Sequence, residues 1–304
     1  MNNLSIERRL GDFMRARLPR GLAEFIMFGL KMAWACLFAG LMLLAIIATK
    51  LLWPEGAALA RYDFLVIYAL SIQVALLYFK MESWAEARVI LLFHISGTIM
   101  EVFKLHMGSW GYPEAGLLKI FGVPLFSGFM YASVGSFIAR AIRVFDMKFE
   151  RYPPFWTTAV LALAIYANFF SHHFIWDIRY ALFAATLMVF WRVRIYFTPF
   201  GHRLWMPLIL AAALASLFLY LAENIGTLTG TWLYAGSHEF SFTNITKLGS
   251  WYLLLFVSFV QVTFVNRKAL SFHNSKILAS RKTQDNPLET NLIAAKECPA
   301  KRSH

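Results

Sequence analysis

Long apolar runs alternate with short polar, mostly basic, connections along most of this chain. A helix that crosses a bilayer needs about 20 mostly apolar residues, and eight stretches meet that requirement. We expect each stretch to form one membrane-spanning helix. The expected spans are residues 31–53, 62–80, 87–105, 122–144, 155–172, 178–195, 204–224 and 248–266.

Basic residues gather in every second connection. They are dense before the first span, in the loops around residues 80–88, 140–151 and 192–203, and after the last span. Cytoplasmic loops of membrane proteins carry an excess of Lys and Arg, so we expect both termini in the cytoplasm of a bacterial inner membrane. The predicted fold is all-α, a polytopic bundle of about eight transmembrane helices.

The two ends of the chain are polar and are expected to lie outside the bundle. Residues 1–22 are predicted to be a retained cytoplasmic lead-in, because the apolar run after them is too long for the core of a signal peptide. Residues 269–304 are predicted to be a disordered cytoplasmic tail. The transmembrane domain then occupies residues 23–268.

Composition agrees with a membrane protein and argues against nucleic-acid binding. The chain is 59% hydrophobic and 15% charged, whereas soluble domains carry about 25% charged residues. The net charge of +12 sits in the connections between spans, where it sets membrane topology. Two cysteines predict neither a disulfide framework nor a thiolate metal site.

Two segments, EVFKLHMGSWGY from residue 101 and ENIGTLTGTWLY from residue 223, resemble each other at an offset of 122 residues. The same offset lays the first four spans over the last four. Because four is even, we expect two parallel repeats related by an axis along the membrane normal, residues 23–145 and 150–268. The matched pairs are Glu101 and Glu223, Gly108 and Gly230, Trp110 and Trp232, and Tyr112 and Tyr234.

Glu101 and Glu223 are the candidate catalytic residues. Glu101 lies 13 residues after Arg88, about 20 Å up a helix and inside the hydrocarbon, where an ionisable group is costly and usually functional. Glu223 lies at the interface, and a solvated position in the headgroup region is the alternative for both glutamates. Aromatic residues near them could instead form an interfacial belt. The candidate substrate-binding residues are Trp110, Tyr112, Asn168, Asn224, Trp232, Tyr234 and Arg179.

A polar cluster, NFFSHHFIWDIRY from residue 168, supplies candidate metal ligands. Imidazole and carboxylate groups bind metals such as zinc, which indicates His172, His173 and Asp177. Adjacent histidines on a helix point about 100° apart, so one ion could take both only at a break in the helix. The alternative is an ion pair of Asp177 with Arg179 beside two interfacial histidines. A metal is the only cofactor that the residues of this chain indicate.

The segment FGVPLFSGFMYASVGS is rich in small residues. Small residues allow helices to approach closely, so this segment predicts close helix packing.

Three stretches of the chain resemble a known family. GTIMEVFKLHMGSWGYPE…GVPLFSGFMYASVGS, YANFFSHHFIWDIRYALFA and KLGSWYLLLFVSFV resemble the YoaT-like bacterial membrane proteins, family of unknown function 817, over about residues 20–268. This resemblance implies a membrane protein and no activity. The order of Glu101, Tyr112 and GVP from Gly122 is also similar to carotenoid-biosynthesis membrane proteins, which would imply an acid that acts on a polyene.

Three functions fit these residues. An intramembrane enzyme could use a buried carboxylic acid to protonate an isoprenoid or another lipid, with aromatic rings to stabilise the resulting cation. A proton- or cation-coupled transporter could use paired glutamates at a repeat interface, and a non-catalytic membrane protein is the third possibility. The expected partners are membrane lipid and an apolar or lipid-like substrate, with no nucleic acid. We expect the candidate residues to share one cavity on the extracytoplasmic side.

Overall fold

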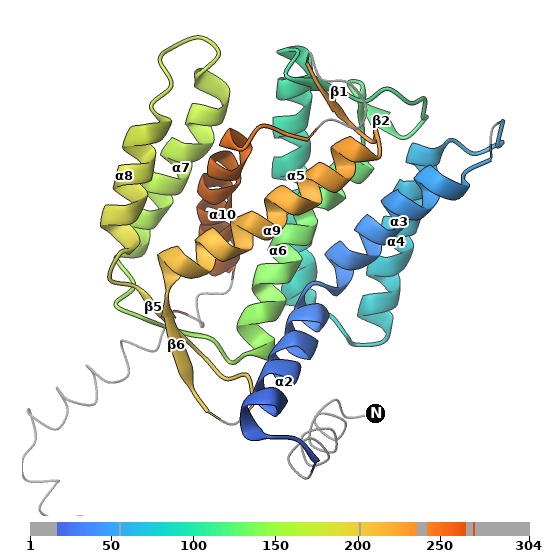
Figure 1. Ribbon diagram of the computed structural model, residues 1–304. Helices are drawn as coiled ribbons and strands as arrows, with labels where there is room; N and C mark the ends of the chain where they lie inside the picture. The colour runs from blue at the N-terminus through green and yellow to red at the C-terminus, as the bar shows by residue number, and fades with distance from the viewer. Residues whose placement is uncertain (1–16, 55, 201, 236–241, 266–269, 271–304) are drawn as a thin grey trace, which may run out of the picture.

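The structure, a computed structural model, describes residues 17–54, 56–200, 202–235, 242–265 and 270. Nine α-helices account for most of these residues, and seven short β-strands join some of them (Figure 1). The all-α class expected from the sequence is confirmed. Most of the expected lead-in and nearly all of the expected tail lie outside the described residues.

The helices follow the expected spans, with shifted ends. They are α2 (Arg20–Ala35), α3 (Leu37–Leu52), α4 (Arg61–Tyr78), α5 (Trp84–His106), α6 (Phe126–Val144), α7 (Phe155–Ser171), α8 (Arg179–Phe190), α9 (Leu208–Leu228) and α10 (Thr246–Val265). The strands are β1 (Trp110–Gly111), β2 (Lys119–Ile120), β3 (Val123–Pro124), β4 (Lys148–Glu150), β5 (Arg194–Phe197), β6 (Leu204–Pro207) and β7 (Leu233–Tyr234).

The structure supports fewer free-standing membrane spans than the sequence pattern predicted. Among the described residues, α4, α5, α9 and α10 are long and apolar enough to cross a bilayer, and α2 with α3 would make a fifth span, bent by 70°. Helices α7 and α8 are shorter, because α8 ends at Phe190 and the chain then enters β5. The predicted span 178–195 is therefore too long. The predicted span 31–53 is not one straight helix, because the end of α2 and all of α3 share this stretch with a bend between them.

Helix α6 lies at the centre of the first half of the chain. It packs against α2, α3, α4, α5 and α10, and most of its residues are buried. A helix enclosed by other helices can carry polar side chains, and α6 carries buried serines and Arg140, which is fully buried. Protein contacts on nearly every side explain why α6 is less apolar than a lipid-facing helix would be.

A buried ion pair joins α6 to the connection between α4 and α5. Arg140 Nη2 donates to Glu82 Oε1 at 2.7 Å, and both side chains are shielded from solvent. Glu82 also accepts hydrogen bonds from Ser136 and Gln73. Arg140 Nη1 donates to the carbonyl of Trp34, close to the bend between α2 and α3, so this pair also ties the bent helices to α6.

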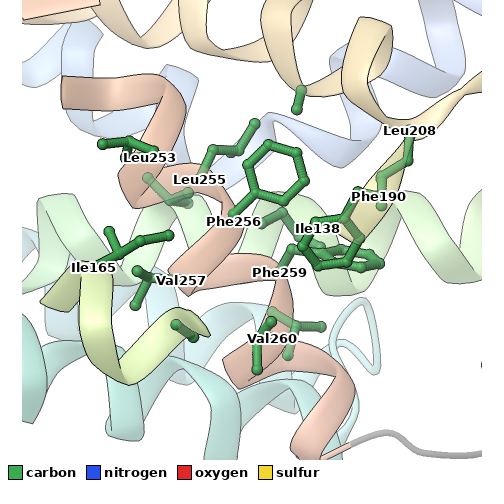
Figure 2. Packing of buried hydrophobic residues seen from close by; sticks show 14 of the residues in the cluster. Ile138, Ile165, Phe190, Leu208, Leu253, Leu255, Phe256, Val257, Phe259 and Val260 are labelled. Carbon is green, nitrogen blue, oxygen red and sulfur yellow. The ribbon is translucent and has the colours of Figure 1, made fainter. Parts of the chain in front are cut away.

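The largest apolar core lies around α10, in the second half of the chain. Side chains of α10 pack there against α6, α7, α8 and α9 (Figure 2). The two halves contain corresponding helix pairs: α6 contacts α5, α3 and α4, while α10 contacts α9, α7 and α8. The halves meet through α6 with α10, α5 with α10, and α3 with α9.

Short strands close both ends of the bundle, and the sequence analysis predicted none of them. Strands β4, β5 and β6 form an antiparallel sheet at one end, and β1 pairs with β7 at the other (Figure 1). The first of these sheets joins the α6–α7 connection to the α8–α9 connection. The second joins the chain after α5 to the chain after α9.

Glycines set the closest helix contact, between α5 and α6. A Cβ atom at Gly128 would lie 2.5 Å from both His94 Nδ1 and Thr98 Oγ1, and one at Gly97 would lie 2.6 Å from the Tyr131 side chain. At separations this short the facing side chain or its helix would have to move. The close packing predicted for this segment from its small residues is therefore present.

We predict that Gly128→Ala destabilises the protein by about 1–3 kcal/mol, the usual cost of overpacking. Thermal unfolding of the purified protein in detergent measures this as a lower melting temperature. Gly29→Ala is the matched control, because Gly29 lies within helix α2 and has open space around it. A Gly128→Ala protein that melts with the wild type would contradict the packing described for α5 and α6.

Candidate functional site

Helices α5 and α9 end in the same way. Gly108 follows α5 with φ of 66°, and Gly230 follows α9 with φ of 63°. In both turns the glycine amide donates to the carbonyl three residues earlier, and the next amide donates to the carbonyl five residues earlier. Only glycine adopts positive φ at little cost, so these two matched glycines reverse the chain beside each helix end.

The reversed segments then meet each other as strands. In the antiparallel pair of β1 and β7, Trp110 lies opposite Tyr234 and Gly111 lies opposite Leu233. The rings of Trp110 and Tyr234 contact edge to face, with centroids 5.7 Å apart. The two similar sequence segments, far apart along the chain, therefore form one structure.

Each reversed segment brings its tryptophan and tyrosine back to its own glutamate. Trp110 Nε1 and Tyr112 Oη donate to Glu101 Oε2 at 2.7 and 2.6 Å. Tyr131 of α6 donates to the other oxygen, Oε1, at 2.7 Å. Glu101 is 4% exposed, and these three donors replace the water that a buried carboxylate loses.

Glu223 has the same two donors in the same places, and it lacks the third. Trp232 Nε1 and Tyr234 Oη donate to Glu223 Oε1 at 2.9 and 2.6 Å. Within the described residues no group donates to Oε2 of Glu223. The indole of Trp232 occupies the space that a Cβ at Gly226 would need, since that atom would lie 1.9 Å from the ring.

The tyrosines of both segments act as donors. Burial raises the pKa of Tyr112 well above its ordinary value, and the charge of Glu101 raises it further. Burial also raises the pKa of Tyr234, and the charge of Glu223 raises it further. Both phenols therefore stay protonated at physiological pH, as donation to a carboxylate requires.

A cavity of about 770 Å³ lies beside both glutamates. The negative charges of Glu101 and Glu223 are close enough to act on each other. Most of the cavity wall is apolar and comes from α2, α3, α6, α9 and α10. The polar and aromatic residues that line it include Glu101, Lys104, Trp110, Tyr112, Tyr131, His172, Arg179, Glu223, Trp232, Tyr234, Lys247 and Trp251.

Two lysines that the sequence analysis did not consider lie in this cavity wall. Lys104, only 5% exposed, has its Nζ 2.9 Å from Nε2 of His173 and 3.3 Å from Nε2 of His172. Lys247 Nζ lies 3.9 Å from the centre of the Tyr234 ring. The sequence did contain a signal for Lys104, because it lies one helical turn after Glu101 and so on the same face of the helix. Lys247 had no such signal.

The two histidines of the predicted metal site contact a lysine. The described residues contain no group of three or more His, Cys, Asp or Glu side chains that could hold a metal ion. His172 and His173 contact Lys104, and desolvation followed by the Lys104 charge lowers the pKa of His173. A metal site at His172, His173 and Asp177 therefore stays a prediction.

Asp177 belongs to the alternative arrangement. Its carboxylate pairs with Arg179 at 2.7 Å and accepts from Asn168 at 3.0 Å. Burial opposes ionisation of Asp177, but the hydrogen bonds from Asn168 and Arg179 outweigh it and hold the pKa below its ordinary value. The ion pair therefore orders the connection between α7 and α8.

The predicted substrate-binding residues divide into two groups. Trp110, Tyr112, Trp232, Tyr234 and Arg179 line the cavity, whereas Asn168 and Asn224 are absent from its wall. Asn168 also accepts from the amide of Ile178. Asn224 accepts from the amide and hydroxyl of Thr243. Both asparagines hold connections in place.

Comparison with known proteins gives a family and no activity. A solved structure, a cross-linked MvINS trimer, has a TM-score of 0.43 and 13% identity over 60% of this chain and 95% of that chain, a likeness too weak to bear on the fold or the site. The uncharacterized protein YoaT of Bacillus subtilis (strain 168) is 41% identical over 244 residues, 80% of this chain and 92% of its own length. The model of a family described as protein of unknown function (DUF817) matches residues 24–259. With this match and this relative, the chain belongs to the DUF817 family.

Proposed function

We propose that this protein is a multi-pass membrane protein that binds a lipid-like molecule in its central cavity and acts on it with the carboxylate of Glu223. The observation that carries the proposal is the cavity itself. Its volume of about 770 Å³ lies in the range of about 300–1,000 Å³ typical of ligand sites. Apolar side chains form most of the wall, and the polar groups gather around the two glutamates, which suits an amphipathic molecule.

A route from the lipid supports a membrane-borne ligand. Leu214 and Phe218 of α9 line the cavity, and these residues are 48% and 68% exposed. Exposed apolar side chains of a membrane protein face lipid tails. A molecule in the bilayer would therefore reach the cavity past α9 without crossing water.

The bundle is proposed to consist of two four-helix repeats. Gly111 and Leu233 are matched positions at the offset of 122, and they lie opposite each other in the β1–β7 pair. A two-fold axis between antiparallel strands requires this register. The contacts of α6 with α5, α3 and α4 correspond at this offset to those of α10 with α9, α7 and α8. This arrangement places the glutamates at the repeat interface.

The orientation is proposed from charge. Arginines and lysines are dense at the end of the bundle that carries the β4–β6 sheet, including Lys148, Arg151, Arg194 and Arg203. By the positive-inside rule this end faces the cytoplasm. Eight spans, with the bent pair counted as one, then leave both termini in the cytoplasm and the paired glutamate segments at the external face.

Glu223 is the better acid or base of the two carboxylates. Glu101 accepts hydrogen bonds on both oxygens, whereas the donors to Glu223 share one oxygen. The second oxygen of Glu223 can therefore exchange a proton with a ligand in the cavity. The indole and phenol rings beside it suit a positive charge that develops on an alkene.

Cation-coupled transport is a weaker proposal. A binding site for a transported cation needs a negative charge that no protein cation already offsets. The ammonium of Lys247 already offsets part of the charge of Glu223. Lys104 and Arg179 add positive charge to the same cavity wall. Repulsion by these groups would oppose entry of a metal cation.

We predict that Ala215→Phe displaces a co-purified lipid-like molecule, because Ala215 lines the cavity and a phenyl ring there would occupy part of the space that the molecule needs. Mass spectrometry of organic extracts from purified protein measures the amount bound per chain, and we expect a loss of at least severalfold. Ala213→Phe is the matched control, because Ala213 is exposed on the same helix and lies outside the cavity wall. Equal amounts of bound molecule in both variants would contradict binding in the cavity.

Glu223→Gln tests the proposed chemistry separately from binding. The amide oxygen keeps the acceptor for Trp232 and Tyr234, and the new amide group replaces the free oxygen, so we expect normal folding. Because proton exchange stops, we predict that the molecule bound to Glu223→Gln differs in chromatographic retention or fragmentation spectrum from the molecule bound to the wild type, since proton transfer alone converts a molecule into an isomer of the same mass. Glu101→Gln, the matched change, should bind the wild-type molecule. The same retention time and fragmentation spectrum in Glu223→Gln and the wild type would refute the acid–base role and leave binding intact.

A further inference from the structure

Lys104 is a buried cation without a carboxylate partner. No Asp or Glu oxygen of the described residues lies within 4.0 Å of its Nζ, and its close contacts are the ring nitrogens of His172 and His173. A buried ammonium is costly unless an opposite charge or several hydrogen bonds compensate it. Two imidazole acceptors compensate Lys104 in part, and they leave one of its three N–H donors for a ligand.

Lys247 occupies a position that does not favour a positive charge. It lies in the first turn of α10, where the helix dipole opposes a cation. Among the described residues its Nζ makes no ion pair within 4.0 Å, and its close contacts are the faces of Tyr234 and Trp110, at 3.9 and 5.9 Å. Aromatic faces attract an ammonium weakly, so stability of the helix does not account for a lysine here.

Three positive charges meet in the cavity wall. Lys104, Lys247 and Arg179 all line the cavity, and the charges of Lys247 and Arg179 act on Lys104. Arg179 has Asp177 as its partner. The carboxylates of Glu101 and Glu223 are held by indole and phenol donors instead of the lysines. The charges of Glu223 on Lys247 and of Asp177 on Lys104 offset part of the repulsion between the cations without forming an ion pair with either lysine, and a negatively charged ligand group would lower the rest.

Histidines contact one of these lysines and aromatic rings contact the other. Lys104 is fixed from the α7–α8 connection by His172 and His173, and Lys247 is fixed by the rings of β1 and β7. Both lysines belong to the cavity wall, so the cavity is the space they share. The apolar part of the same wall, from α2, α3, α6, α9 and α10, continues from this cluster.

We propose that the polar end of the cavity binds the anionic head of an amphiphile, a phosphate or carboxylate, between Lys104 and Lys247, with the apolar tail along α6 and α10. This inference rests on the proposed binding of a lipid-like molecule and names its class. Phosphate and carboxylate oxygens accept charge-assisted hydrogen bonds from ammonium groups. The head would then lie between the two ammonium groups, and the chain would lie in the apolar part of the cavity.

The test compares probes that differ in one feature. The full chain, in nanodiscs of zwitterionic lipid, is titrated with dodecyl phosphate below its micelle-forming concentration, and tryptophan fluorescence reports binding because Trp110, Trp232 and Trp251 line the cavity. Dodecyl maltoside supplies the same tail with a neutral head, and inorganic phosphate supplies the head alone. We expect dodecyl phosphate to bind at least about tenfold more tightly than either, as charged hydrogen bonds imply.

Lysine variants locate the site. Lys247→Met keeps an unbranched side chain without the ammonium group and should weaken dodecyl phosphate binding about tenfold, with little effect on dodecyl maltoside. Lys50→Met is the matched control, because Lys50 is exposed on α3 outside the cavity wall, and it should bind as the wild type does. Lys104→Met should act as Lys247→Met does. The comparison of probes on the wild type stands even if Lys104→Met does not fold.

Each other result overturns a definite part of the proposal. Equal binding of the phosphate and maltoside probes, unchanged in Lys247→Met, would refute the anionic head and leave the cavity as a lipid site. Tight binding of inorganic phosphate alone would show a free-anion site and refute the amphiphile. Binding of neither amphiphile, with no effect of Ala215→Phe, would refute the proposed function itself.

Discussion

A buried carboxylate that has lost its water needs other donors, and that need shapes the centre of this protein. Glu101 and Glu223 each receive an indole N–H and a phenol O–H from a segment that returns along the helix end. The return depends on a glycine with positive φ. The returning segments pair with each other as β1 and β7. These four hydrogen bonds fix the position of the aromatic rings, which line the cavity beside the glutamates, and the paired strands add a contact between the halves.

The two halves use this shared framework differently. Tyr131 gives Glu101 a third donor, and within the described residues Glu223 has no corresponding group. Lys104 matches Gly226 at the offset of 122, where the ring of Trp232 requires a residue without a side chain. Lys247 matches Leu125. One half therefore holds its carboxylate in place, and the other presents a carboxylate oxygen and a cation to the cavity, a division of roles that suits one asymmetric ligand.

Sequence patterns could predict the parts of this structure that depend on local repetition. The structure of one helix end fixes the spacing from the glutamate to the glycine, the tryptophan and the tyrosine. Because this spacing occurs twice in the sequence, it identified both glutamates and their aromatic partners. The bend at Cys36, the strands and the early end of α8 depend on contacts between distant segments, such as Arg140 with Trp34. Lys104 was missed because a lysine near a span end resembles an interfacial anchor. The sequence also could not place Lys104 beside both histidines, because this contact joins α5 to the α7–α8 connection.

The pairing of the two segments is the central claim, and a disulfide tests it most directly. With Cys36 and Cys298 replaced by Ser, Gly111→Cys and Leu233→Cys would place two thiols on opposed residues of β1 and β7, whose Cα atoms in an antiparallel pair lie about 4.5–5.5 Å apart, within disulfide reach. Mild oxidation in native membranes should give nearly complete cross-linking within one chain, seen as one linked peptide by mass spectrometry. Gly111→Cys with Gly29→Cys, on α2 at the other end of the bundle (Figure 1), should give none. Two thiols at 111 and 233 that react singly with maleimide but never with each other would contradict the account.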